Sequence, residues 1–510
     1  MRGPERDTAR LLSVDHLQSD LIGRSVRSGG ITLAAQAVKV AVQTAAIVVL
    51  ARLLAPSDFG LFAMIAAFLT MLELFKDLGL STATVQRAEL TLRQVSTLFW
   101  LNAMLGLAIA IVFALAAPLF AWGYGEEKLL ALAPVAGLAF VFTGMSAQHL
   151  ALLRRQMRFG QLARVQVGSD IISLVIAVCA ALAGLGVWSL VIQRIAWAFS
   201  NAAGAWLTCR WIPGRPGPLG EVRAFLSYGG NATGSMAVNY LAGSLDKVLI
   251  GYYWGASALG FYDRAQRLQM LPVQNLNLPI GNVALAALSR LVTQPDAYRR
   301  MYLATVERLA MAIAPLGGLL ISCSEPLMVL LLGEPWRETA PILAWLGISM
   351  IYNPVGYSVS WLFMSQDRTA EMLRAGIANS ALSIGAIIVG LPYGPVGVAA
   401  ALVVSGALLR VPLLFWIAGR SGPVGIADLW RVSAMPAITG LVVTAGTWAV
   451  QAWDSMDQLP LAARVCVLVL TTGLTALATY MVFPAGRRAL RSIAKHAVLL
   501  LGGTSRTAAR

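Results

Sequence analysis

The residues of this sequence best suited to chemistry are charged side chains embedded in long apolar stretches. Of the 510 residues, 58% are hydrophobic and only 12% are charged, yet basic side chains recur inside the apolar runs. A charge at the centre of a bilayer costs on the order of 3 kcal/mol, so such side chains are expected to face protein or water and are candidate site residues. The basic candidates are Lys39, Arg194, Lys247, Arg264 and Arg267.

These cations can either bind an anion or pair with carboxylates. Arg264 and Arg267 are three residues apart and share one helix face, and Asp263 lies at the i,i+4 position from which it can reach Arg267. Lys39 and Arg194 have no acidic residue within one helical turn. Each is therefore expected to find a carboxylate on another helix or to remain available to an anion.

Four acidic residues are candidates for ion-coupling or gating groups. Asp246 and Asp263 lie near the outer halves of two expected helices, where a protonatable carboxylate can compete with Lys247 or Arg267. A structural ion pair is the alternative interpretation for both. Glu73 and Asp77 lie at the cytoplasmic end of another expected helix, where they either gate the transport path or cap the helix.

No motif of a soluble enzyme occurs in the sequence. It contains no GxxxxGK[ST] phosphate-binding loop and no HExxH or GxSxG motif. The four cysteines include no CxxC pair, and they lie in or beside apolar runs. The loops between apolar runs are too short to build a catalytic domain. We therefore expect neither enzymatic activity nor a cofactor or metal site.

The elements that must position these residues are membrane-spanning helices. An ordinary soluble domain carries about 25% charged residues, roughly twice the share in this chain, which argues against a soluble enzyme and against a disordered chain. One span takes roughly 20 apolar residues. The apolar runs between charged or Pro/Gly-rich breaks predict fourteen spans, so the expected fold class is an all-α polytopic membrane protein.

The excess of positive charge is explained by membrane topology. A net charge of +15 would suggest nucleic acid in a soluble protein. Here alternate loops hold nearly all of the basic loop residues, and the loops on the other side hold only Arg52, Lys128 and Arg337. The positive-inside rule then places both termini in the cytoplasm, and no nucleic-acid partner is expected. Arg410, near the cytoplasmic end of its span, is expected to extend to the lipid headgroups.

Weak internal similarity predicts two pseudo-symmetric six-helix lobes followed by two further helices. Residues 54–62 (LAPSDFGLF) match residues 254–262 (WGASALGFY), which aligns Gly60 with Gly260. Two parallel repeats would place a substrate site at their interface. The expected organisation is a cytoplasmic N-terminal segment (1–28), a first lobe (29–209), a Pro/Gly-rich cytoplasmic linker (210–224), a second lobe (225–417), two further helices (418–483) and a basic cytoplasmic tail (484–510).

Several motifs, in order, resemble a known family. They include ARLLAPSDFGLFAM (51–64), QHLALLRRQMRF (148–159), LGFYDRAQRLQMLPVQ (259–274) and LLGEPWRETAPIL (331–343). Over residues 20–480 the chain resembles the polysaccharide transporter family of oligosaccharide flippases, of the colanic-acid-exporter type, within the multidrug/oligosaccharidyl-lipid/polysaccharide exporter superfamily. The resemblance implies a fourteen-helix exporter of the bacterial inner membrane that moves an undecaprenyl-diphosphate-linked oligosaccharide to the periplasmic leaflet.

A diphosphate suits the basic candidates, because arginine and lysine make their strongest hydrogen bonds to such anions. They would hold it in a central cavity during alternating access. Candidate glycan contacts are Asn239, Tyr240, Tyr262 and Gln274. Polysaccharide polymerase and other assembly proteins are candidate partners, besides membrane lipids. The alternatives are a multidrug or organic-cation exporter, a lipid II flippase and a membrane-embedded polymerase or ligase.

Overall fold

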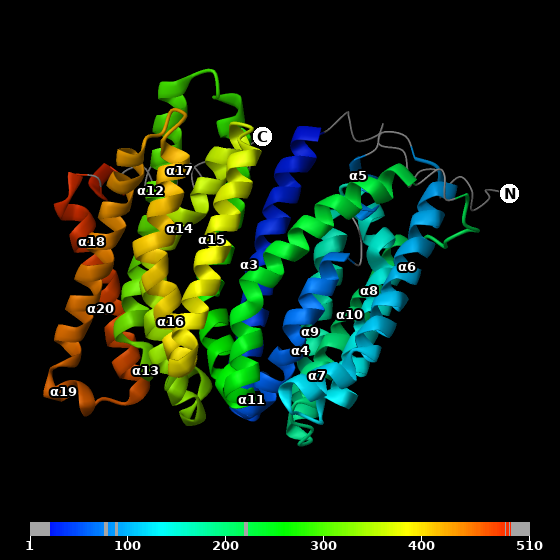
Figure 1. The fold of residues 1–510 in the computed structure, drawn as a ribbon, viewed down its shortest axis with the longest axis horizontal. Coiled ribbons are helices and arrows are strands. Elements are labelled where there is room, and N and C mark those ends of the chain that lie inside the picture. Colours follow the sequence, from blue (N-terminus) through cyan, green and yellow to red (C-terminus); the bar gives the residue numbers. More distant parts are fainter. Residues whose placement is uncertain are drawn as a thin grey trace, which may run out of the picture. The chain divides into compact units, whose positions relative to one another are not determined.

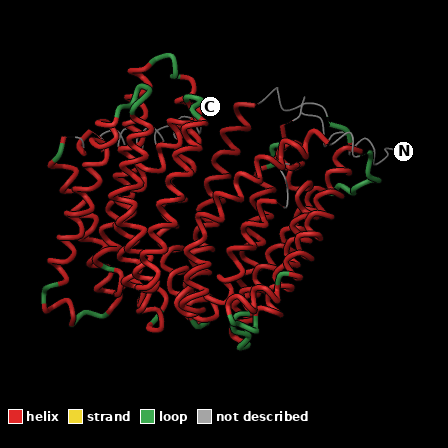
Figure 2. The backbone as a smooth tube through the Cα atoms, viewed as in Figure 1, coloured by secondary structure: helices red, strands yellow, loops and turns green. Residues whose placement is uncertain are grey.

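The computed structural model describes residues 21–75, 80–86, 90–218, 223–484, 486–488 and 490. Every regular element in these ranges is a helix, which confirms the predicted all-helical class (Figures 1 and 2). Two compact units emerge from the packing: a first unit up to Gly260 and a second unit from Phe261 onward.

Helices α3 to α10 and the part of α11 up to Gly260 build the first unit. Their bounds are α3 (Leu21–Leu53), α4 (Pro56–Phe75), α5 (Leu80–Gln86), α6 (Leu92–Leu115), α7 (Ala117–Tyr124), α8 (Leu129–Arg155), α9 (Phe159–Leu182), α10 (Trp188–Cys209) and α11 (Arg223–Arg290).

The rest of α11 and the remaining helices build the second unit. These helices are α12 (Pro295–Ser322), α13 (Ser324–Leu332), α14 (Ala340–Ser365), α15 (Thr369–Gly390), α16 (Gly394–Ser405), α17 (Val411–Gly419), α18 (Ile426–Gln451), α19 (Asp454–Asp457) and α20 (Leu461–Val482). Two 3₁₀ turns, η2 (Glu334–Thr339) and η3 (Leu391–Tyr393), and one π-helical turn, η4 (Gly406–Arg410), connect some of them.

Local sequence signals explain where some helices begin and bend. The Thr91 hydroxyl accepts the backbone N–H of Gln94 at 3.2 Å, and the Gln94 side chain accepts the N–H of Thr91 at 3.1 Å. This capping box satisfies two amides at the start of α6 that would otherwise lack partners. The 68-residue α11 is interrupted at Gly255, whose backbone angles of φ 77° and ψ −175° are accessible essentially only to glycine.

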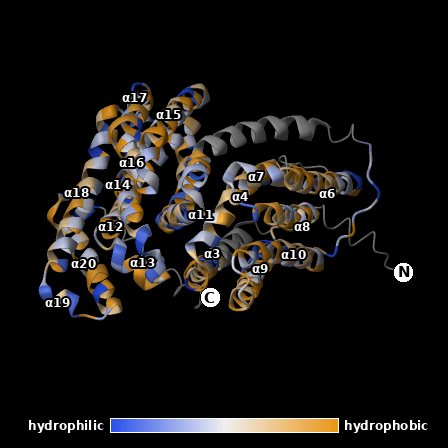
Figure 3. Cartoon of the chain, turned by 60° about the horizontal axis from the view of Figure 1, so that its bottom comes forward, coloured by the Kyte–Doolittle hydropathy of each residue, from blue (hydrophilic) through white to orange (hydrophobic). Residues whose placement is uncertain are grey.

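Ten stretches of the described residues are long and apolar enough to cross a membrane. One of them, residues 369–419, has 51 residues, which exceeds the roughly 20 that a single span needs. Hydrophobic residues occur along the length of the helices in both units (Figure 3). On α20, Leu470 and Leu474 are 65% and 68% exposed, which suits a surface covered by lipid. The chain is thus a multi-pass membrane protein, and the count of fourteen spans stays a prediction.

Helices α4 and α11 make a very close crossing in the first unit. A Cβ atom on Gly60 would lie 1.6 Å from the Ala256 carbonyl oxygen, and one on Gly260 would lie 2.0 Å from the Pro56 carbonyl oxygen. Pro56 and Gly60 correspond to Ala256 and Gly260 in the internal repeat found in the sequence. The contact is therefore reciprocal, as a local two-fold relation between the repeated segments would make it.

The described part of the expected linker, residues 210–218, is hydrogen-bonded to helix α6 of the first unit. Residues 210–218 form no helix. The backbone N–H groups of Gly214 and Gly217 donate to Ser96 Oγ at 3.0 Å and to Thr97 Oγ1 at 2.7 Å, both on α6. The boundary between the two compact units lies further along the chain, after Gly260 within α11. The predicted division into two six-helix lobes stays a prediction.

Candidate functional site

Arg194 pairs with a carboxylate on a distant helix. Its Nη2 atom on α10 lies 2.8 Å from Oε1 of Glu73 on α4, and the two side chains are 20% and 32% exposed. The guanidinium carbon also lies 5.7 Å from the ring centroid of Phe140, at the range of a cation–π contact. Of the two outcomes expected for Arg194, the structure shows pairing with an acid. The same contact gives the gating candidate Glu73 a structural partner.

We expect the Arg194–Glu73 pair to behave as one energetic unit. Arg194→Gln and Glu73→Gln each leave a half-buried charge without this partner, whereas the double variant removes both charges. The double variant is expected to be more stable than the sum of the single effects by about 1–2 kcal/mol. Unfolding free energies of all four proteins in one detergent measure this coupling. Additive effects would contradict a direct ion pair.

Lys39 lies near an acid that sequence analysis does not single out. Lys39 is half-buried on α3, which packs against α9, and its charge acts on Asp170 of α9. The Asp170 carboxylate also accepts a hydrogen bond from Nε1 of Trp197 at 2.7 Å. Asp170 stands far from Lys39 in the sequence, so only helix packing reveals the relation.

Two arginines in the second unit share one carboxylate oxygen. Oδ2 of Asp263 lies 2.9 Å from Nη2 of Arg264 and 2.8 Å from Nε of Arg267. Asp263 and Arg264 are buried, whereas the Arg267 side chain is 46% exposed. The predicted i,i+4 pairing of Asp263 with Arg267 is confirmed, and Arg264 joins the same carboxylate. These three residues are called the Asp263 cluster below.

The remaining candidates are placed as follows. Asp246 is buried, and one of its oxygens accepts the backbone N–H of Lys247 at 2.8 Å. Tyr262 is fully buried, and Gln274 is exposed. Asp77 and the side chains of Asn239 and Tyr240 lie outside the described residues.

Arg410, which the sequence predicts to extend to the lipid headgroups, instead makes hydrogen bonds within the second unit. It ends the π-helical turn η4, and its Nη1 donates to Ser383 Oγ at 2.9 Å while its Nη2 donates to the Leu402 carbonyl. Tyr352 and Tyr357 lie within electrostatic reach. Among the described residues, no carboxylate pairs with Arg410, and its Nε has no hydrogen-bond partner. Arg410 therefore points into the protein with neutral partners.

Metal-binding groups are not gathered anywhere in the part of the chain that the structure describes. No group of three or more His, Cys, Asp or Glu residues there has a geometry that could hold a metal ion.

Comparisons with known proteins give a matching family and several relatives. A family described as "polysaccharide biosynthesis protein" matches residues 49–341. Teichuronic acid biosynthesis protein TuaB of Bacillus subtilis is 28% identical over 56% of this chain and 60% of its own length. Succinoglycan biosynthesis transport protein ExoT of Rhizobium meliloti is 26% identical over 66% of this chain and 70% of its own length. The chain thus spans less than two thirds of the length of TuaB.

A solved structure of the lipid II flippase MurJ, in an inward closed conformation, shares the fold. The TM-score is 0.69 at 16% sequence identity, over 90% of this chain and 98% of that protein. At this identity the likeness describes the fold alone.

Proposed function

Because the chain belongs to the family of polysaccharide biosynthesis proteins, we propose that it is a flippase for an undecaprenyl-diphosphate-linked oligosaccharide in the bacterial inner membrane. The oligosaccharide would be a repeat unit of a surface polysaccharide. The names of its relatives support a role in polysaccharide biosynthesis, and ExoT is named as a transport protein.

The placement of Arg410 is the observation that best supports an anionic substrate. It lies nine residues before the end of α17 at Gly419, or about 14 Å along the helix at 1.5 Å per residue. A cation this far from the end of its helix, whose described partners are a hydroxyl and a carbonyl, is a candidate functional group. An anionic group such as a diphosphate would make charge-assisted hydrogen bonds to it.

The other basic candidates keep a proposed role in diphosphate binding, but some of them are already paired with carboxylates. Arg194 would have to exchange Glu73 for the substrate, and Arg264 and Arg267 already share Asp263. We propose that such exchange accompanies alternating access, with Glu73 and Asp263 as counter-ions of the empty state. Lys39, Lys247, Asp246 and the central cavity stay parts of the proposal.

A cation exporter would instead need carboxylates that are accessible to an organic cation and not already paired. Glu73 and Asp263 each accept an arginine at 2.8–2.9 Å, so both negative charges are already engaged. We therefore favour the oligosaccharide flippase over this alternative.

Polymer export tests the proposal. In a strain without the gene, complemented with variants, we expect Arg410→Gln to lower surface polysaccharide at least about tenfold, since one hydrogen bond to a charged group is worth about 1.5–3 kcal/mol. Lipid-linked repeat units should accumulate at the same time. Both are measured on cell extracts, with protein level in the membrane checked by immunoblot.

Arg374→Gln is the matched control, because it removes the same charge from an exposed position in the second unit. It should support normal polymer. Wild-type polymer levels with Arg410→Gln would contradict the role of Arg410. A null strain with normal polymer but altered drug tolerance would contradict the proposed function itself.

A further inference from the structure

A pocket with three arginines lies at one end of helices α8, α9 and α10 in the first unit. Its volume is about 410 Å³, within the usual range for ligand sites. No carboxylate of the described residues pairs with any of these arginines. The lining residues are Arg158, Gln161, Arg164, Leu207, Thr208, Cys209 and Arg210.

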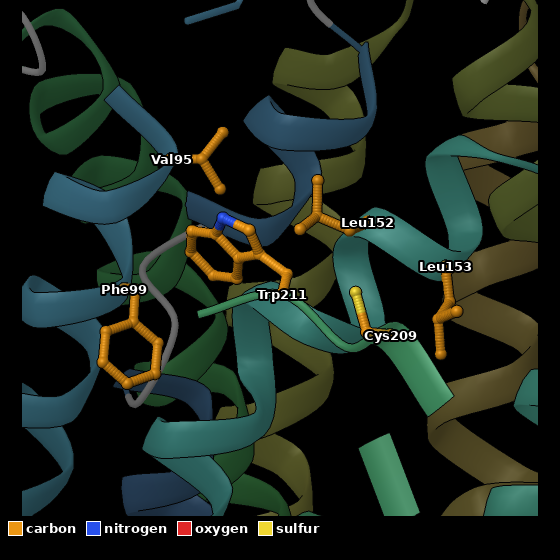
Figure 4. Packing of buried hydrophobic residues seen from close by; sticks show 6 residues of the cluster. All are labelled: Val95, Phe99, Leu152, Leu153, Cys209 and Trp211. Carbon is orange, nitrogen blue, oxygen red and sulfur yellow. The ribbon is translucent and has the colours of Figure 1, made fainter. Parts of the chain in front are cut away.

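The walls of this pocket are held by a packed core. Cys209 and Trp211 are 4% and 2% exposed and pack with Val95, Phe99 and Leu152 (Figure 4). Arg210 lies between these two anchored residues, with a left-handed φ of 51°. Its backbone is therefore fixed while its side chain stays exposed. The backbone on this side of the pocket is therefore held by the packing of its neighbours.

The same local structure recurs 210 residues later, in the second unit. Met157 and Asp367 both adopt a left-handed φ, of 53° and 56°. The following arginines, Arg158 and Arg368, each donate a backbone N–H five residues back, to Leu153 and Phe363, at 3.0 and 2.9 Å.

The side chains of these arginines also repeat one contact. Nη1 of Arg158 lies 3.4 Å from the Gln156 side-chain oxygen, and Nη1 of Arg368 lies 3.4 Å from that of Gln366. Arg210 likewise corresponds to Arg420. The pocket of the first unit can therefore be compared, residue by residue, with the corresponding segment of the second unit.

The two copies differ at the residue that supplies negative charge. In the second unit, Glu371 binds Arg368 through both oxygens, at 3.0 and 2.9 Å, and lies 3.5 Å from Arg420. The corresponding residue of the first unit is Gln161, whose side-chain oxygen is buried and has no partner among the described residues. The first unit keeps the arginines and lacks their carboxylate.

We propose that this pocket binds the phosphate of a lipid headgroup, which takes the place of the Glu371 carboxylate. Arginine recognises phosphate and carboxylate oxygens with the same forked geometry. The pocket lies at the ends of apolar helices, on the side where the positive-inside rule places the cytoplasm, and basic pockets between membrane helices on that side suit anionic headgroups. This site is separate from the proposed transport function.

Gln161→Glu is the decisive variant, because it supplies the missing carboxylate with almost no change of shape. Native mass spectrometry of the purified full chain would measure binding of phosphatidylglycerol and of sodium pyrophosphate. We expect the wild type to bind a phosphate-bearing lipid, and Gln161→Glu to lower that affinity at least about tenfold. Arg158→Gln combined with Arg210→Gln should do the same.

Gln458→Glu adds the same charge at an exposed position elsewhere and should bind lipid as the wild type does. Unchanged lipid binding by Gln161→Glu would overturn the proposal. Pyrophosphate binding as tight as lipid binding would also overturn it, in favour of a soluble phosphate. Because the readout is equilibrium binding, loss of lipid here together with normal polysaccharide export would leave the proposed transport function intact.

Discussion

Replacing Asp263 with asparagine is expected to destabilise the protein by about 3–5 kcal/mol and to abolish transport. The carboxylate oxygen that Arg264 and Arg267 share at 2.9 and 2.8 Å would become a neutral amide. Since the Arg264 side chain is only 7% exposed, water cannot replace the lost charge. Equilibrium unfolding in detergent gives the free energy, and polymer export gives the function.

Asp457→Asn is the matched control for this prediction. Asp457 lies 2.9 Å from Arg464, the same distance as between Asp263 and Arg264, but its side chain is 74% exposed. An exposed pair of this kind contributes about 0–1 kcal/mol, so this variant should unfold nearly as the wild type does. The comparison separates the effect of burial from the effect of pairing.

A second substitution tests the cause of the destabilisation. Asp263→Asn combined with Arg264→Met removes both buried charges and should recover much of the lost stability without restoring transport. If Asp263→Asn alone unfolds with the wild-type free energy, the Asp263 cluster does not hold its arginines in the way described.

Gly60→Ala is expected to prevent the first unit from folding normally, despite adding a single methyl group. The new Cβ would lie 1.6 Å from the Ala256 carbonyl oxygen, and this backbone atom cannot move unless helices α4 and α11 separate. Overpacking commonly costs about 1–3 kcal/mol, and a clash with backbone belongs at or above the upper end. We expect a large loss of monodisperse protein by size-exclusion chromatography and a lower melting temperature.

Gly168→Ala provides the comparison, since nothing lies within 4 Å of the added Cβ on α9. Alanine is the better helix former, so this variant should be as stable as the wild type or slightly more stable. Equal yields of the Gly60 and Gly168 variants would show that the α4–α11 crossing is looser than these distances indicate.

Local sequence patterns predict the features that depend on short-range geometry. The low share of charged residues and the long apolar runs predict a helical membrane protein, and the fold confirms it. The family resemblance rests on ordered motifs and is confirmed by the match over residues 49–341. The Asp263–Arg267 pair is also predictable, because residues four apart on a helix are neighbours in any tertiary structure.

Contacts between distant residues are decided by helix packing. Glu73 and Arg194 stand 121 residues apart, and nothing in either segment names the other as its partner. Arg410 is assigned to the headgroups by its position in the sequence, whereas the turn η4 and the neighbouring α15 direct its guanidinium into the second unit.

The helical class, the family and the i,i+4 ion pair thus follow from the sequence alone. They depend on hydrophobicity and on the spacing of residues within a single segment of the chain. The partner of each buried charge, the glycine crossing of α4 and α11 and the contrast between Gln161 and Glu371 needed the tertiary structure. Electrostatic pairing depends on distances in space, and separation along the chain does not determine those distances.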